Sequence, residues 1–332
     1  MMQHHLLQQP AAASPHAAAV IGPGRVGRAI SRMSMPPAPL YGRGDVLPQN
    51  LQGPVWVCTT NDALEDVVLH AVAPQQRQQL VFIQNGMLLP WLETHGLQHN
   101  TQVLLYMSAT EDGEVTDGGR TVVYGPHSSH VVQLLQHGGV SCKQLGSRAE
   151  YRSAMVVKLL WSCIFWLLSA GLGGATVGSI VQQRAGAVDD LVSELLPIAA
   201  QYLSDTVAAP PAQQLQPQEQ HGNHQQQDVN QNQLQQQQEE QQHVPPQQVL
   251  QAAAAPASSS TLLLPGLDQA AVTQQLLDYS LSIAAAVPSA DMARREFAWR
   301  NGWLLGRRVT PQHEQWLLRA GCSDLLMQCA KR

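Results

Sequence analysis

The chain has 332 residues, enough for two ordinary domains that each have a hydrophobic core. Only 13% of the residues are charged and the formal net charge is −5 at pH 7, which excludes a basic nucleic-acid footprint and a strongly acidic tail. A small molecule is therefore the expected partner, and no nucleic acid is expected.

The five cysteines are scattered along the chain, and no CxxC pair is among them. Such a set indicates free thiols in a reducing compartment. The first sixteen residues contain neither Arg nor Lys, which disfavours an organellar transit peptide. We expect residues 1–16 to form a disordered tail and the protein to be cytoplasmic, with organellar targeting as the alternative.

In the first half of the chain, short runs typical of β-strands alternate with turns and helical stretches. Gly22 ends the first strand and opens a helix that runs to about Met33. Asp62 is expected to cap a helix over residues 63–72. The pattern predicts an α/β fold with a Rossmann-type, doubly wound parallel sheet over residues 17–150. The expected strands are 17–21, 40–41, 55–59, 80–83, 103–107 and 120–124, the last of which closes the sheet.

From Ser153 onward the apolar periodicity is that of long helices, which predicts an all-α domain over residues 151–332. Leu159–Ala170 is an apolar run of only a dozen residues. A membrane span needs about 20 residues, so this run predicts a buried core helix and no membrane partner. The expected helices are 155–172, 188–203, 268–286, 291–308 and 312–318.

Residues 211–252 interrupt the helical half with a tract dominated by Gln. A tract without apolar periodicity cannot bury enough surface to offset its chain entropy, so we expect a disordered insert. A variant that lacks residues 211–252 should keep nearly all of its activity and its unfolding temperature. A collapse of folding, measured by thermal denaturation, would contradict this interpretation.

A GxGxxG sequence follows the first strand and opens the first helix, the context of a dinucleotide-binding turn. Gly22 permits the tight turn, Gly24 lets the backbone approach a pyrophosphate, and Gly27 allows close packing of helix on sheet. Arg25 and Val26 stand at the start of the helix, whose free N–H groups face the phosphates. The alternative is a glycine-rich turn that binds no ligand.

Cofactor choice depends on the residues after the second strand. NAD sites usually carry an acidic residue there, whereas this chain has Arg43 shortly before Asp45. A guanidinium can pair with the 2′-phosphate of NADP, so NADP is the expected cofactor. Alternatively, Arg43 is a surface residue and Asp45 contacts the ribose. No metal is expected, because the neighbouring His127 and His130 have no carboxylate or thiol nearby.

Three further motifs follow in chain order: Gln84-Asn85-Gly86 at a strand end, Lys158 within an apolar helix, and Glu296 followed by Asn301-Gly302. Together with the GxGxxG turn, this series resembles the ketopantoate reductase family. The resemblance implies a Rossmann-type domain followed by a helical domain like that of 6-phosphogluconate dehydrogenase, and a homodimer is one expected assembly. It also implies NADPH-dependent reduction of ketopantoate to pantoate, on the route to pantothenate and coenzyme A.

The resemblance also implies roles for individual residues. Lys158 would be the general acid that protonates the ketone oxygen, Asn85 would bind the substrate, the cofactor or the lysine, and Glu296 would orient the substrate or pair with Lys158. Ser162, Ser289 and Asn301 would bind the substrate. The alternatives are a snorkelling lysine, a turn asparagine and a surface carboxylate.

Two departures from the family pattern bear on the function. The family has an asparagine one turn after the lysine, where this chain has Ser162. The segment between Gly27 and Val55 is also too short for the usual two strands and intervening helix. The same fold acting on a different ketone is therefore an alternative. Another is a non-catalytic NADP-binding protein that uses the Gln-rich insert for protein contacts.

Overall fold

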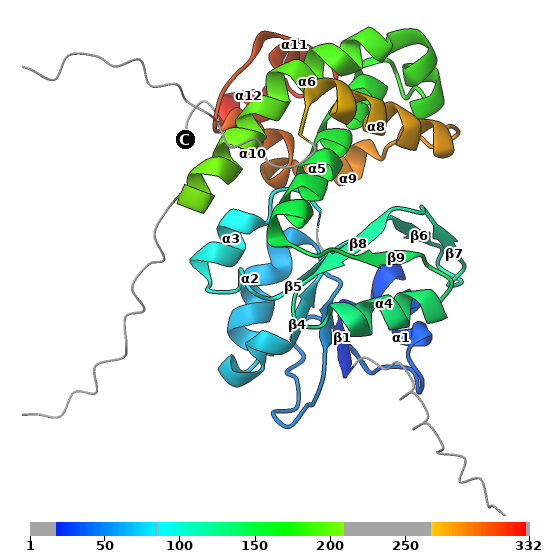
Figure 1. Cartoon of the computed structure of the whole chain (residues 1–332), viewed down its shortest axis with the longest axis vertical. Helices are drawn as coiled ribbons and strands as arrows, with labels where there is room; N and C mark the ends of the chain where they lie inside the picture. The colour runs from blue at the N-terminus through cyan, green and yellow to red at the C-terminus, as the bar shows by residue number, and fades with distance from the viewer. Residues whose placement is uncertain (1–17, 84, 209–266, 330–332) are drawn as a thin grey trace, which may run out of the picture. The chain divides into compact units, whose positions relative to one another are not determined.

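The computed structural model describes residues 18–83, 85–208 and 267–329 (Figure 1). The expected tail over residues 1–16 and the expected insert over residues 211–252 lie outside the described residues. Contacts join the described residues up to Thr206 with those from Leu267 onward into one compact unit. The division of the chain at residue 150 lies within this unit and stays a prediction.

Seven strands form the main sheet of this unit, in the order β2-β1-β3-β4-β5-β8-β9. The first five are parallel to one another, β8 is antiparallel to β5, and β9 is parallel to β8. A separate two-stranded sheet pairs β6 with β7. The strands are β1 (Ala19–Ile21), β2 (Leu40–Tyr41), β3 (Val55–Val57), β4 (Leu80–Phe82), β5 (Thr101–Leu104), β6 (Met107–Ala109), β7 (Val115–Asp117), β8 (Thr121–Tyr124) and β9 (Cys142–Gln144).

The central strands are short apolar runs because both faces of the sheet are covered. Side chains alternate along each strand: Ala19 and Ile21 belong to one hydrophobic cluster, and Val20 between them belongs to the other. On the Val20 face lie α1 (Arg25–Met33) and α4 (Ser128–His137). The opposite face is covered by α2 (Leu64–Asp66), α3 (Leu89–Thr94) and the start of α5 (Arg148–Gly171). The expected doubly wound sheet is thereby confirmed, with one antiparallel neighbour.

Two predictions in the first half are wrong. The strand that ends at Tyr124 does not close the sheet, because α4 leads to one more strand, β9. Asp62 caps no helix. Its carboxylate instead accepts a hydrogen bond from the indole of Trp299 at 3.3 Å. The expected helix 63–72 is divided into a 3-10 turn (Asn61–Ala63), the short α2, and a π-helical turn (Val67–Ala71).

The rest of the unit is helical, as expected. After α5 come α6 (Val177–Ala208), α8 (Gln269–Ser282), α9 (Ala290–Arg295), α10 (Asn301–Leu305), α11 (Pro311–Arg319) and α12 (Ser323–Cys329), with a 3-10 turn over Phe297–Trp299. Another 3-10 turn, Pro74–Gln79, precedes β4 in the first half. Asp268 caps α8 by accepting the Ala271 N–H, and Pro311 occupies the first turn of α11. The single helix expected over residues 291–308 is wrong, because the backbone leaves the helical region at Arg300.

Helix α5 is longer than its apolar run indicated. It has 24 residues, and by length and composition it is the one described helix that could cross a membrane. In the fold, however, 67% of its most apolar window is buried. Packing inside the unit therefore accounts for its apolar character, as expected for a core helix.

Candidate active site

The glycine turn between β1 and α1 is shaped by steric needs at each glycine. Gly22 has φ +100°, and a Cβ there would lie 2.7 Å from the carbonyl oxygen of Cys58. A Cβ on Gly27 would lie 1.9 Å from the carbonyl oxygen of Gly22. At Gly24, the N-cap of α1, a Cβ would meet no atom within 4 Å. Backbone atoms therefore leave no space for a side chain at Gly22 or Gly27, where the helix packs on the sheet. At Gly24 the space in front of the helix N-terminus is free of protein atoms, and this is where a ligand would approach.

A cavity of about 280 Å³ adjoins this turn; we call it the glycine-loop cavity. Arg43 and Asp45 both line it, together with Gly22 and Pro23. The Asp45 carboxylate already accepts the Gly42 N–H at 2.7 Å. Arg43, the predicted contact for NADP, and Asp45, the alternative contact for the ribose, thus line the same cavity.

The other two residues predicted at the cofactor lie at the start of α1. Val26 lines a second cavity, of about 240 Å³, which we call the junction cavity. Arg25 is exposed, and its Nε lies 3.8 Å from the carboxylate of Glu111. Arg28, one turn further along the helix, pairs with the same carboxylate at 2.5 Å.

A third cavity, of about 320 Å³, is lined by Lys158; we call it the lysine cavity. The junction cavity shares Thr59 and Thr60 with the glycine-loop cavity. It shares Asn85, Leu105 and Met107 with the lysine cavity. Because neighbouring cavities have lining residues in common, they lie next to one another between the glycine turn and the Lys158 amine.

Lys158 does not snorkel to solvent. Its Nζ donates a hydrogen bond to the carbonyl oxygen of Leu105 at 2.6 Å and lies 4.7 Å from the centre of the Tyr106 ring. The pKa of Lys158 is lowered from 10.5 to about 7, mainly by burial and then by the nearby charge of Arg300, while the charge of Glu296 partly opposes both. An amine with a pKa close to neutral can give up or accept a proton at physiological pH.

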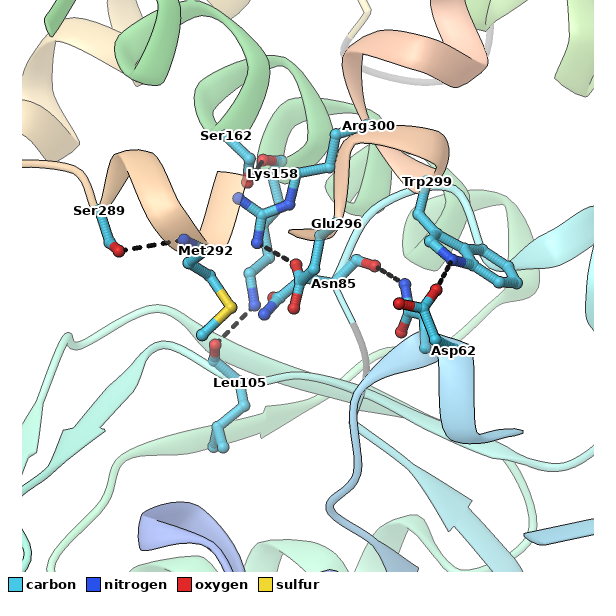
Figure 2. A network of polar contacts seen from close by, with 11 residues as sticks. Asp62, Asn85, Leu105, Lys158, Ser162, Ser289, Met292, Glu296, Trp299 and Arg300 are labelled. Atoms are coloured by element: carbon cyan, nitrogen blue, oxygen red, sulfur yellow. Dashed lines mark hydrogen bonds and ion pairs between the residues drawn. The ribbon is translucent and has the colours of Figure 1, made fainter. Parts of the chain in front are cut away.

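The turn after β4 places Asn85 beside this amine, and Asn85 lines both the junction and the lysine cavities (Figure 2). Gly86 has φ +87°, and a Cβ there would lie 2.4 Å from the carbonyl oxygen of Trp299. That same oxygen accepts the Met87 N–H at 2.7 Å, while Asn61 donates to the Asn85 carbonyl at 2.8 Å. The turn is therefore held by a segment more than 200 residues further along the chain.

Glu296 faces the same region, but its ion-pair partner is Arg300 and not Lys158 (Figure 2). The two side chains are only 10% and 12% exposed. Glu296 lines the junction cavity and Arg300 the lysine cavity. Arg300 is not among the site residues predicted from the sequence, although its spacing of four residues from Glu296 is a signal for such a pair.

The three residues predicted to bind substrate differ in their positions. Ser162 lines the lysine cavity one turn after Lys158, and its hydroxyl donates to the Lys158 carbonyl oxygen at 2.9 Å. Ser289 caps α9, where its Oγ accepts the Met292 N–H at 3.2 Å (Figure 2). Asn301 is 1% exposed and hydrogen-bonded to His313 at 2.8 Å. Of the three, the structure brings only Ser162 into contact with this cavity.

No protein-family model matches the chain, and no curated protein sequence matches it. Solved structures do. Ketopantoate reductase from Staphylococcus aureus is similar over 94% of this chain and 99% of its own, at 14% identity and a TM-score of 0.54. The 2-dehydropantoate 2-reductase from Methylococcus capsulatus is similar over 95% and 98%, at 13% identity and a TM-score of 0.55. D-mandelate dehydrogenase, solved with NADH and anilino(oxo)acetate, is similar over 93% and 99%, at 9% identity and a TM-score of 0.56.

These similarities cover both the sheet and the helices, so they concern the whole arrangement and not the glycine turn alone. Because the sequence identities are only 9% to 14%, these structural similarities are evidence about the fold alone. The order of motifs in the sequence predicted the same family. The chain therefore has the fold of the ketopantoate reductases.

Proposed function

We propose that the protein is an NAD(P)H-dependent oxidoreductase that reduces the ketone of a 2-oxo acid. The observation that carries the proposal is the buried Lys158 amine, which lines a cavity together with Asn85. The junction cavity beside it shares lining residues with the glycine-loop cavity. Ketopantoate is the first substrate to test, because the resemblance in sequence and fold leads to it.

The residues of the glycine turn fit a dinucleotide. The absence of any protein atom within 4 Å of a Cβ on Gly24 leaves room for a pyrophosphate at the start of α1. Gly22, Arg43 and Asp45 line the cavity that would hold the adenosine half, and Val26 and Asn85 line the next one. When bound, a reduced nicotinamide supplies the hydride. For the 2′-phosphate of NADP, Arg43 is the proposed contact.

Lys158 provides the proton for this reaction. As hydride reaches the ketone carbon, negative charge develops on its oxygen, and a nearby ammonium stabilises that charge and transfers a proton to give the hydroxyl. Its hydrogen bond to the Leu105 carbonyl holds the amine in place before substrate binds. Asn85, beside the amine, orients the ketone. Glu296 keeps Arg300 paired and adds negative charge near the lysine.

The activity is tested with purified full-length protein, NADPH or NADH, and a panel of 2-oxo acids that includes ketopantoate, followed by the loss of absorbance of the reduced nicotinamide. We expect turnover with at least one of these acids. Tight binding of NADPH with no turnover across the panel would favour a non-catalytic nucleotide-binding protein instead.

The pKa of Lys158 predicts how the reaction depends on pH. The lysine acts as an acid only when protonated, and its pKa is about 7 in the free protein. We expect kcat/KM for ketone reduction to be level below pH 7 and to fall about tenfold per pH unit above it. Initial rates between pH 5.5 and about 9.5 measure the profile, and a level profile through this range would contradict the assignment.

Assembly and location are further proposals. The S. aureus ketopantoate reductase is described as dimeric. By analogy we propose a homodimer in the cytoplasm, for which light scattering after size-exclusion chromatography and microscopy of a tagged protein are the respective tests.

A further inference from the structure

The lysine cavity contains a second cation that the proposed reaction does not use. Arg300 lies at the start of α10, and its side chain is only 12% exposed. It lines the same cavity as Lys158 and Ser162. Figure 2 shows its guanidinium close to the lysine side chain, on the side of Ser162.

The pairing of Arg300 leaves hydrogen-bonding capacity unused. One terminal nitrogen pairs with Glu296, while Nε is buried and has no hydrogen-bond partner among the described residues. Glu296 is the ion-pair partner of Arg300 and acts on Lys158 only through its charge, while the Lys158 amine is hydrogen-bonded to the Leu105 carbonyl. Glu296 itself lines the junction cavity; the acidic residue that lines the lysine cavity, Asp117, is exposed and accepts the N–H groups of Gly119 and Ser141, each at 2.9 Å.

Two buried cations beside one buried anion are suited to an anionic ligand, because an unpaired buried charge is costly. A guanidinium matches a carboxylate especially well, since two parallel N–H donors can meet its two oxygens. Ser162 lines the same cavity as Arg300, and its hydroxyl is hydrogen-bonded to its own helix and not to the guanidinium.

Three aromatic residues form one part of the wall of the lysine cavity. The Tyr106 and Trp161 rings both lie edge-on to the Tyr279 ring, at centroid distances of 5.1 and 5.2 Å. The Trp161 indole donates to the Ser280 hydroxyl at 2.9 Å, which holds its ring in place. Ile283 and Ala286 extend this apolar surface. Such a wall favours a bulky apolar group over a polar one.

We propose that the lysine cavity selects 2-oxo acids with a bulky apolar side chain, with Arg300 binding the carboxylate and the aromatic wall packing against the side chain. The inference rests on the proposed reductase function, to which it adds the substrate class. With the carboxylate on Arg300, the adjacent ketone oxygen is directed to the Lys158 amine.

The test measures binding and turnover separately. Phenylglyoxylate, its uncharged amide and pyruvate are titrated calorimetrically into the full-length protein saturated with NADP⁺ or NAD⁺. The wild-type protein should bind phenylglyoxylate about 10- to 100-fold more tightly than the amide, the scale of a charge-assisted hydrogen-bonded pair. It should also bind phenylglyoxylate more tightly than pyruvate, which lacks the ring.

Arg300→Gln should remove the preference for acid over amide and leave amide binding unchanged. Arg300→Lys keeps a positive charge beside Glu296, so it should retain part of the preference for acid over amide. If Arg300→Gln fails to fold, Arg300→Lys still tests the proposal. Arg295→Gln is the matched control, because Arg295 is exposed and pairs with Asp291 outside the three cavities. In turnover, loss of Arg300 should raise KM for the acid more than it lowers kcat.

An unchanged ratio of acid to amide affinity in both Arg300 variants would overturn the role of this residue. Tighter binding of pyruvate than of phenylglyoxylate would overturn the role of the aromatic wall. If the affinities follow the proposal but no ketone is reduced, the reductase function fails while the recognition of the acid stands.

Discussion

Replacement of Lys158 by methionine is expected to lower kcat/KM for ketone reduction by about 100-fold or more, the usual effect of losing a general acid. Methionine is unbranched and apolar, so it can occupy the buried position of the lysine stem. Steady-state rates with reduced nicotinamide and a 2-oxo acid measure the loss. Lys143→Met is the matched control, since Lys143 is exposed on β9 and lies outside the three cavities.

The same variant has a predicted effect on stability. The folded-state pKa of Lys158 is lowered from 10.5 to about 7, so between these values the unfolded chain binds more protons than the folded one. The lysine therefore destabilises the fold fully below pH 7, and progressively less as pH rises from 7 to 10.5. Lys158→Met should unfold at the same temperature as the wild type or higher at pH 6. A clearly lower unfolding temperature there would mean that the rate loss reflects misfolding.

Replacement of Gly24 by valine is expected to weaken NADPH binding by about 10- to 100-fold, the scale of one or two lost hydrogen bonds to a charged group. A side chain at this N-cap meets no protein atom within 4 Å, and the backbone there is in the extended region, so the fold should tolerate it. It would instead occupy the space where phosphate oxygens approach the helix N–H groups. Fluorescence titration with NADPH measures the change.

Gly186→Val is the matched control for this substitution, because Gly186 is exposed on α6 and a Cβ there is equally unobstructed. It should leave NADPH affinity unchanged. Wild-type affinity in Gly24→Val, with the unfolding temperature intact, would exclude the glycine turn as the phosphate site.

Several features of the fold were predictable because neighbouring residues specify them. The glycine turn was one, since the strand before it and the helix after it are visible as local patterns, and both are present as β1 and α1. The position of Lys158 on an apolar helix was another, because periodicity identifies the buried face. Pro311 at the start of α11 likewise follows from the chemistry of proline itself.

Other features depend on contacts between distant segments. The partner of Asp62 is Trp299, and the Asn85-Gly86 turn is held by the Trp299 carbonyl. Neither contact could be read from local patterns, so a helix cap was predicted where a long-range hydrogen bond exists. Strand β9 was missed for a similar reason: only one of its three residues is buried, which weakens the strand pattern.

For this protein, the sequence alone determined the class of fold, the glycine turn between β1 and α1 and the position of Lys158 on an apolar helix, since each is specified by residues within a few positions of one another. Only the tertiary structure decided that Glu296 does not pair with Lys158, that Asn301 lies in the core, and that Arg300 shares a cavity with Lys158. The physical reason is that burial and the lining of a cavity depend on which segments meet in space, and Lys158 on α5 is distant in the chain from Arg300 at the start of α10.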